Sequence, residues 1–411
     1  MSVRSRTILP TCVTLAVLSV ALTSGQPVQS DGFALQIENL ATPAAGQSSA
    51  PYLSASPKGI ILSWVERTGD TAVLRFSELN GDAWTSPRNV ASGTNWFVNW
   101  ADVPSVARLS NGTLTAHWLQ KSGSDTYAYD VRLSYSNDDG KTWRQSFVPH
   151  VDGTQTEHGF VSLFDAPGGG LALVWLDGRA MTAGHDGHEG SGDMSLRFAA
   201  YDGKWKQVAE AALDARVCEC CPTAMAMTTD GPLVAYRDRS DNEVRDIHVT
   251  RLENGKWTAP VAVHNDEWRV PACPVNGPAL SARGRDVAVA WFMAKNDQPK
   301  SFVAFSSDAG RTFGAPVRLD DEASLGRVDV ELLPDGAAAS YVEFANQRAS
   351  FRVRRIARDG TRSAPVTIAG VTGNRTSGLP RMISHRDRLV FAWVDREGTS
   401  SQVRTARATI R

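Results

Sequence analysis

A cluster of cysteines near the middle of the chain is the feature best suited to chemistry. Cys218, Cys220 and Cys221 share one short segment, and Cys273 follows 52 residues after Cys221. Clustered thiolates bind soft metal ions such as Cu(I), and Zn(II) accepts thiolate and imidazole ligands together. The candidate ligands are Cys218, Cys220, Cys221, Cys273, His158, His185 and His188. Copper or zinc is the cofactor that this set predicts.

The same cysteines can instead form disulfides, which an oxidising compartment favours. A bond between the adjacent Cys220 and Cys221 would strain the ring that it closes, so a bond from the cluster to Cys273 is the favoured pairing. The sequence leaves a disulfide and a metal or redox site as alternatives.

The N-terminal segment predicts export. Arg4 and Arg6 give a positive start, and a mostly apolar stretch, Val13 to Leu22, precedes small and polar residues. This pattern is typical of a secretory signal peptide over residues 1–30, and an uncleaved anchor is the alternative. This stretch is too short for a confident membrane span, and no apolar run elsewhere has membrane length, so the mature chain is expected to lack a span and to be periplasmic or extracellular.

Length and charge restrict the class of protein. The 411 residues exceed one ordinary domain, but a repeat array can form a single larger unit, here over residues 31–411. The formal charge of −1 gives no basic footprint for nucleic acid. A small molecule, a glycan or a protein is therefore the expected partner.

A turn motif recurs between runs of β-branched and aromatic residues. Residues 136–143 and 306–313 both read Ser-x-Asp-x-Gly-x-Thr-aromatic. Looser copies lie at 80–84, 202–205, 254–257 and 359–361. Repeats of about 50 residues built from short strands are typical of a β-propeller, in which the Asp satisfies backbone donors of the turn.

Aromatic residues at the ends of apolar strands give a second repeat. They are Trp64, Trp118, Trp175, Tyr236, Trp291, Tyr341 and Trp393, spaced by 50 to 61 residues. The all-β fold expected is thus a seven-bladed propeller, with six blades and an extra hairpin as the alternative. The last repeat ends after three strands, so we expect Phe33–Leu40 to pair with Val403–Ile410 and close the ring.

Blade order places the unusual residues on one face, at the mouth of the ring. The loops that lead into each innermost strand, and those after the repeated aromatics, emerge together there. Candidate ligand-binding residues on these loops are Trp96, Trp100, Asp102, Asp177 and Asp238. A structural alternative for the acids is that they bond backbone donors at strand ends.

The turn motif resembles the Asp-boxes, or BNR repeats, of the sialidase superfamily. That resemblance implies a propeller fold and, in sialidases, three arginines that clamp a carboxylate and a Tyr nucleophile activated by a Glu. By this resemblance Arg327 and Arg375 are candidate clamp residues, and Tyr341 and Glu343 are a candidate catalytic pair. The first-blade arginine of the family has no counterpart in Ser49–Leu53.

Three functions follow from the sequence and stay open. The first is an exported propeller that binds a ligand, metal or partner at a Cys- and His-rich mouth. The second is a glycoside hydrolase of sialidase type, acting on sialic acid or a related acidic sugar. The third is an interaction scaffold of the cell envelope. The missing arginine favours the first, and whether the chain is an enzyme is left undecided.

Overall fold

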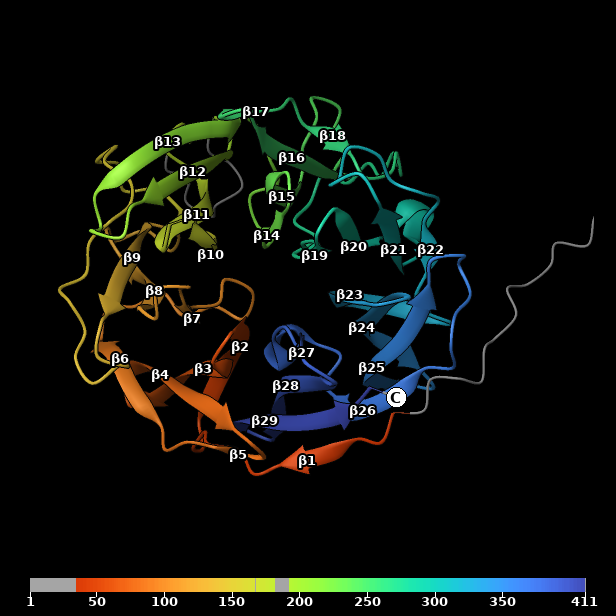
Figure 1. Ribbon diagram of the computed structural model, residues 1–411, viewed down its shortest axis with the longest axis horizontal. Helices are drawn as coiled ribbons and strands as arrows, with labels where there is room; N and C mark the ends of the chain where they lie inside the picture. Colours follow the sequence, from red (N-terminus) through yellow and green to blue (C-terminus); the bar gives the residue numbers. More distant parts are fainter. Residues whose placement is uncertain (1–34, 167, 182–191, 411) are drawn as a thin grey trace, which may run out of the picture.

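Short runs of alternating apolar and polar residues, separated by Gly, Asn and Asp turns, build antiparallel strands that group into seven sheets. The computed structural model describes residues 35–166, 168–181 and 192–410. The sheets stand around a central axis as the blades of a β-propeller (Figure 1). The prediction of seven blades is confirmed, and the expected leader, residues 1–30, lies outside the described residues.

Each blade runs from an innermost strand to the rim. Blade 1 contains β2 (Ser48–Ser56), β3 (Gly59–Thr68), β4 (Thr71–Asn80), β5 (Ala83–Trp84) and β6 (Arg88–Gly93). Blade 2 contains β7 (Ser105–Arg108), β8 (Leu114–Lys121) and β9 (Tyr129–Ser136). Blade 3 contains β10 (His158–Ala166), β11 (Gly170–Asp177), β12 (Ser195–Tyr201) and β13 (Gln207–Asp214).

The second half of the ring repeats this order. Blade 4 contains β14 (Ala224–Thr228), β15 (Gly231–Arg237), β16 (Ile247–Glu253), β17 (Lys256–Trp257) and β18 (Val261–Ala262). Blade 5 contains β19 (Ala279–Arg283), β20 (Asp286–Met293), β21 (Lys300–Ser306) and β22 (Val317–Arg318). Blade 6 contains β23 (Ala323–Leu333), β24 (Gly336–Ala345), β25 (Arg348–Ala357) and β26 (Val366–Val371).

Blade 7 joins the two ends of the chain. It contains β27 (Arg381–His385), β28 (Arg388–Glu397), β29 (Ser400–Thr409) and, at the rim, β1 (Glu38–Leu40). The register pairs Glu38 with Arg407 and Leu40 with Thr405. The predicted closure is therefore confirmed, although the strand is shorter than the sequence pattern indicated.

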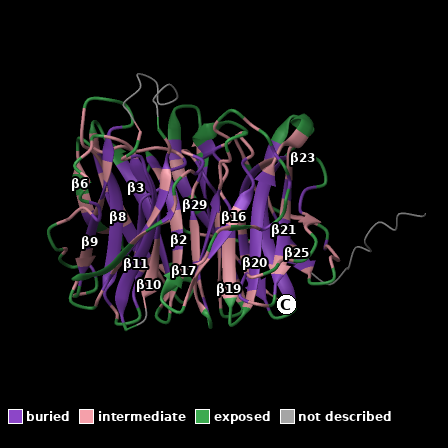
Figure 2. Ribbon diagram, turned by 90° about the horizontal axis from the view of Figure 1, so that it is seen from above, coloured by how far each residue is buried: buried purple, intermediate pink, exposed green. Residues whose placement is uncertain are grey.

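The repeated aromatics explain why the blades stack. The buried apolar side chains form seven clusters, one at each junction between neighbouring blades. Each junction contains one repeated aromatic, which comes from the second strand of its blade and packs toward the preceding blade. Trp64 thus fills the junction of blades 7 and 1, and Trp175 that of blades 2 and 3. Seen from the side, the strands are largely buried, and exposure concentrates in the loops (Figure 2).

The turn motif closes the face opposite the mouth. The Asp138 carboxylate accepts hydrogen bonds from Thr142 N at 2.9 Å and Thr142 Oγ1 at 2.6 Å, and Ser136 Oγ lies 2.7 Å away. Gly140 has φ +79°, and a Cβ there would lie 2.4 Å from the Phe76 ring of the neighbouring blade. The turn around Asp308 repeats these bonds, so the motif has a structural role.

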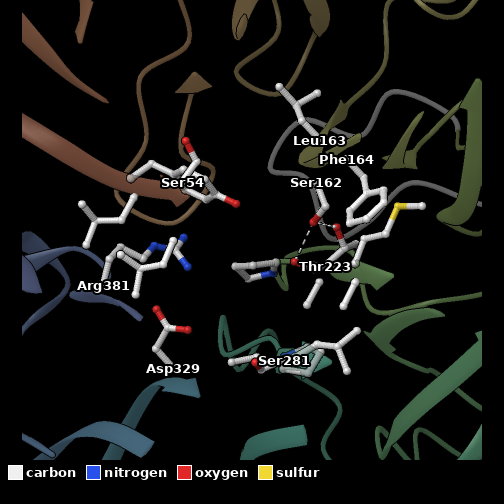
Figure 3. A pocket seen from close by; sticks show the side chains of 18 of the residues that line it. Ser54, Ser162, Leu163, Phe164, Thr223, Ser281, Asp329 and Arg381 are labelled. Carbon is white, nitrogen blue, oxygen red and sulfur yellow. Dashed lines mark hydrogen bonds between the residues drawn. The ribbon is translucent and has the colours of Figure 1, made fainter. Parts of the chain in front are cut away.

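A cavity of about 490 Å³ follows the propeller axis (Figure 3). Its walls come from the innermost strands of six blades and from the segment before β7. The charged side chains that line it include Asp329, Glu331 and Arg381, from blades 6 and 7. The described residues include only two short 3-10 helices, Lys295–Asp297 and Arg375–Ser377, and no helix among them has the length and apolarity to cross a bilayer.

Candidate metal centre

The cysteine cluster lies in the loop from β13 to β14, where the chain passes from the rim of blade 3 to the innermost strand of blade 4. Backbone bonds fix this loop on both sides. Val217 N donates to Met194 O at 2.8 Å, and Cys218 N donates to Arg237 O at 3.0 Å. Cys273 lies in the corresponding loop that leads into blade 5. The register therefore brings the two loops to the same face, as the sequence predicted.

The three clustered sulfur atoms are close enough to share one ion. Cys218 Sγ lies 3.3 Å from Cys221 Sγ and 3.8 Å from Cys220 Sγ, and all three lie within 4.8 Å of one another. Tetrahedral thiolates at about 2.3 Å from a zinc ion stand about 3.8 Å apart, so the spacing fits thiolate ligands. Cys218 and Cys221 are buried and Cys220 is half-buried.

Cys273 joins the cluster without a covalent bond. The Cys220 and Cys273 side chains both pack on the hydrophobic cluster between blades 3 and 4. Burial, and hydrogen bonding with the thiols of Cys218, Cys221 and Cys273, raise the pKa of the Cys220 thiol. All four described cysteines are free thiols, so the expected disulfide to Cys273 is not found.

Two buried arginines set the charge of the cluster. Arg245 Nη1 donates to Cys218 Sγ at 3.2 Å and to Glu219 Oε2 at 2.7 Å. Arg237 lies beside it and donates to the carbonyl oxygens of Arg245, Asn276 and Phe292. Burial opposes ionisation of Cys218, but hydrogen bonds from the other two thiols and the charges of Arg245 and Arg237 outweigh it. They hold the pKa of Cys218 well below its usual range.

The histidines expected beside the cysteines are not brought to them in the described structure. The groups of candidate ligands that contain His158 consist of His150 and carboxylates rather than thiols. His185 and His188 lie outside the described residues. The centre that the described residues support is therefore built from thiols, and of the expected imidazole ligands only His158 is shown to lie elsewhere.

The aromatic and acidic candidates at the mouth divide between packing and buried hydrogen bonds. Trp96 stacks on Trp118 with ring centroids 5.5 Å apart, which accounts for its position. Trp100 is half-buried, with the guanidinium of Arg327 at 5.8 Å from its ring centre and that of Arg375 at 5.9 Å. Of the two tryptophans, Trp100 is the one held between charged groups at the mouth.

The acids mostly satisfy donors of the fold. Asp177 is fully buried and accepts from the Trp175 indole at 2.8 Å and from Arg179 Nε at 2.7 Å. Asp238 lies 3.3 Å from His248 Nδ1. Glu66 accepts from the indole of Trp64 in the same way as Asp177 does from Trp175. Glu66 and Asp177 each accept from the indole of the repeated tryptophan and also from a backbone donor, Ala45 N and Arg179 N at 3.1 Å, which supports the structural alternative for Asp177.

Asp102 belongs to a buried group that the sequence did not indicate. Tyr129 Oη donates toward Asp102 Oδ2 at 3.0 Å and Glu157 Oε1 at 2.6 Å, and Phe160 N donates to Asp102 at 2.8 Å. Burial raises the pKa of Asp102 to about 7 and that of Glu157 to about 8. Only the fold joins these residues, since they come from three different segments of blades 2 and 3.

The four residues suggested by the sialidase resemblance do not assemble into one site. Tyr341 is fully buried in the cluster between blades 5 and 6. Glu343 is also buried, and it pairs with Arg352 and accepts from Asp321 N at 2.7 Å. These contacts leave the proposed Tyr–Glu pair inside the fold, away from any substrate.

The two candidate arginines differ from each other. Arg327 is buried, and its guanidinium holds the loop before β27 by donating to Ser377 Oγ and to Asn374 O at 2.7 Å. Burial lowers the pKa of Arg327 to about 10. Arg375 is exposed at the mouth, so of the two it alone remains free to contact a ligand.

Comparisons with known proteins give the fold and little more. No family model matches the chain, and no curated protein is similar to it. The polysaccharide lyase Uly1 is similar over 88% of this chain and 90% of its own, with 10% identity and a TM-score of 0.54. The sialidase NanB of Streptococcus pneumoniae is similar over 93% of this chain and 95% of its own, with 8% identity and a TM-score of 0.47. At 10% identity the likeness to Uly1 shows a shared fold only.

Proposed function

We propose that the protein binds a soft metal ion, Cu(I) or Zn(II), at the mouth of the propeller. Cys218, Cys220 and Cys221 supply three thiolates, and Cys273 completes the set from the neighbouring blade. The observation that carries the proposal is the spacing of the three sulfur atoms, all within 4.8 Å of one another. Thiolates at this spacing are ligands that soft metals prefer.

The charge around the cluster supports a metal better than a disulfide. Binding requires deprotonated thiols, and Arg245 already stabilises one thiolate at Cys218. A bond between Cys218 and Cys221 would leave Cys220 without a partner except Cys273. The two buried guanidiniums also offset the net negative charge of a complex in which several thiolates bind one metal ion.

Metal titration tests this function. Purified protein, reduced under anaerobic conditions, is titrated with Cu(I) or Zn(II) against a chromophoric chelator. We expect uptake that saturates and that falls by one equivalent in Cys218→Ser and in Cys221→Ser, with a smaller loss of affinity in Cys273→Ser. Thr223→Ser, in the same loop, is the matched control and should bind as the parent does. Undiminished uptake by the double variant Cys218→Ser/Cys221→Ser would reject the thiolate centre.

We also propose that the protein acts outside the cytoplasm. The basic and apolar pattern of residues 1–30 supports export. Fractionation of cells that express the full chain checks this: the mature form should appear in the periplasm or medium with its N-terminus beyond the apolar stretch. Retention of the intact chain in the cytoplasm would contradict it.

A hollow at the mouth supports a second candidate function, the binding of an acidic glycan. A cavity of about 300 Å³ is lined by Arg67, Arg375, Arg396 and Trp100, and its described lining contains no carboxylate. Guanidinium groups bind carboxylates and sulfates, and an aromatic ring packs on a sugar face. Glycan-array binding that is lost in Arg375→Ala would support this function, and cleavage of a fluorogenic sialoside would extend it to catalysis.

A further inference from the structure

A second group of potential ligands lies where blades 2 and 3 meet, and it contains no cysteine. Asp130 comes from β9, His150 and Asp152 from the connection between β9 and β10, and His158 from the first position of β10. Asp177, the last residue of β11, completes the group. These residues, called the junction cluster below, are distinct from the mouth cysteines.

The two imidazoles of the junction cluster lie between two carboxylates. The rings of His150 and His158 stack with centroids 3.8 Å apart and planes 6° from parallel. Along one edge, Asp152 Oδ2 lies 3.0 Å from His150 Nδ1 and 3.3 Å from His158 Nε2. Along the other edge, Asp130 Oδ1 lies 3.9 Å from His150 Nε2 and 3.7 Å from His158 Nδ1. Each carboxylate therefore faces one nitrogen of each ring.

Buried nitrogen atoms in this cluster lack partners. The His150 side chain is 4% exposed and that of His158 is 0% exposed, yet Nε2 of each has no hydrogen-bond partner among the described residues. Leaving a buried polar atom unsatisfied costs about 1–3 kcal/mol, so native structures usually supply a partner. His150 Nε2 lies on the Asp130 edge, where a bound cation would supply this partner, whereas His158 Nε2 faces Asp152 on the other edge.

The charges show which edge needs a cation. Arg179 already neutralises the side of Asp177 and Asp152, since its Nε lies 2.7 Å from Asp177 Oδ1 and its Nη2 lies 3.5 Å from Asp152 Oδ2. Asp130 lies on the opposite edge. With neutral imidazoles, three carboxylates against one guanidinium leave two negative charges, which one divalent ion would balance.

We propose that the junction cluster binds a divalent transition-metal ion of the Zn(II) class, ligated by Asp130 Oδ1 and one nitrogen each of His150 and His158. Asp130 Oδ1 lies 3.9 and 3.7 Å from the two nitrogens, and three atoms at about this spacing surround a point about 2.2 Å from each, which suits Zn–N and Zn–O bonds. Asp152 then serves as the outer carboxylate that accepts the second N–H of both rings.

Binding requires two local adjustments. Lone pairs of stacked, parallel rings do not converge, so the two imidazoles must tilt apart to direct nitrogens at the ion. His158 Nδ1 also lies 3.1 Å from Thr156 O, a contact that must break when this nitrogen is the ligand. The ion would fasten blade 2 to blade 3 beside the connection from β9 to β10. This connection is the longest irregular segment between two blades in the described structure.

The experiment uses untagged protein and Co(II) and Zn(II) as probes. The variant Cys218→Ser/Cys220→Ser/Cys221→Ser/Cys273→Ser removes the mouth thiols. We expect it to bind one equivalent of Zn(II), with a higher thermal midpoint, and to give a Co(II) spectrum without sulfur charge-transfer bands. His150→Gln and Asp130→Asn in that background should lower affinity at least tenfold. His264→Gln is the matched control, because His264 pairs with Asp266 alone at 2.7 Å.

Parent protein provides the second measurement, in case the quadruple variant does not fold. Its Zn(II) stoichiometry should fall by one equivalent in His150→Gln while the Co(II)–thiolate bands persist. Absence of Zn(II) binding by a folded quadruple variant, or a stoichiometry unchanged by both His150→Gln and Asp130→Asn, would overturn the proposal. If the parent protein gives no Co(II)–thiolate bands but still loses one equivalent of Zn(II) binding in His150→Gln, the mouth centre is rejected and the junction site stands.

Discussion

At the scale of single residues, Arg245 is the side chain on which the mouth cluster depends most. It is 4% exposed and pairs with Cys218, with Glu219 at 2.7 Å and with Glu243 at 2.8 Å. Arg245→Met leaves buried negative charge without a partner, which we expect to cost about 3–5 kcal/mol of unfolding free energy. Urea denaturation of the reduced, metal-free protein measures this.

Arg239 provides the matched comparison, because it pairs with the same two glutamates but is 20% exposed. Solvent screens that pair, so Arg239→Met should cost about 1 kcal/mol or less. Equal losses for the two variants would show that the thiolate cluster does not need Arg245 in particular.

Glu331 gives the chain a pH-dependent stability that can be measured. It lines the axial cavity and accepts from Ser384 Oγ at 2.8 Å, and burial together with the charge of Asp329 raises the pKa of Glu331 to about 8. The unfolded chain releases this proton near the usual value for Glu, so the folded state binds more protons between about pH 4.5 and 8. The unfolding free energy of the protein must therefore fall as pH rises through that window.

Glu331→Gln removes this ionisation. Relative to the parent, the variant should gain stability on going from pH 5 to pH 8.5, by about 1 kcal/mol or more. Urea midpoints of both proteins across this range test it. Parallel curves for parent and variant would mean that the carboxyl is ionised freely in the folded state.

At the scale of elements, the turn motif is a local device with a definite cost of removal. Asp138→Ala deletes the acceptor for Thr142 N and Thr142 Oγ1, so we expect it to lower the thermal midpoint of unfolding. Asp308→Ala should lower it equally, since the bonds of its turn are equivalent. Asp70→Ala, in a turn without such bonds among the described contacts, is the control for thermal denaturation. A null effect at both motif positions would deny the turn its structural role.

Periodic features of the sequence predicted the elements well because their cause is local. The repeated aromatics fall on the second strand of every blade, since each junction needs one large apolar side chain there. Blade 2 departs from the pattern: a single bridge, Leu133 to Phe147, stands where a fourth strand was expected.

The sites were less predictable. Arg245 gains its role from contacts between the β13–β14 and β15–β16 loops, and His150 from contacts between blades 2 and 3; no spacing in the sequence encodes either.

At the scale of the whole molecule, closure of the ring joins stability to the two proposed sites. Strand β1 pairs with β29, and Leu35 just before it packs in the cluster between blades 6 and 7. Without β1, blade 7 exposes an edge strand and every junction loses the constraint of a closed circle. The proposed metal sites would join blade 2 to blade 3 and the loops that lead into blades 4 and 5, so they would staple a ring that β1 has already closed.

Removal of residues 35–40 tests this order of dependence. We expect the mature chain without them to unfold at a lower temperature by roughly 5 °C or more, since each kcal/mol moves the midpoint of a chain this long by about 2 °C. Glu38→Ala, which removes only the ion pair with Arg407, is the control and should shift it little. Because the metals bind the folded ring, excess Zn(II) should raise the midpoint of the truncated chain without restoring it. Full restoration by metal would show that the blade junctions, rather than the closing strand, hold the circle together.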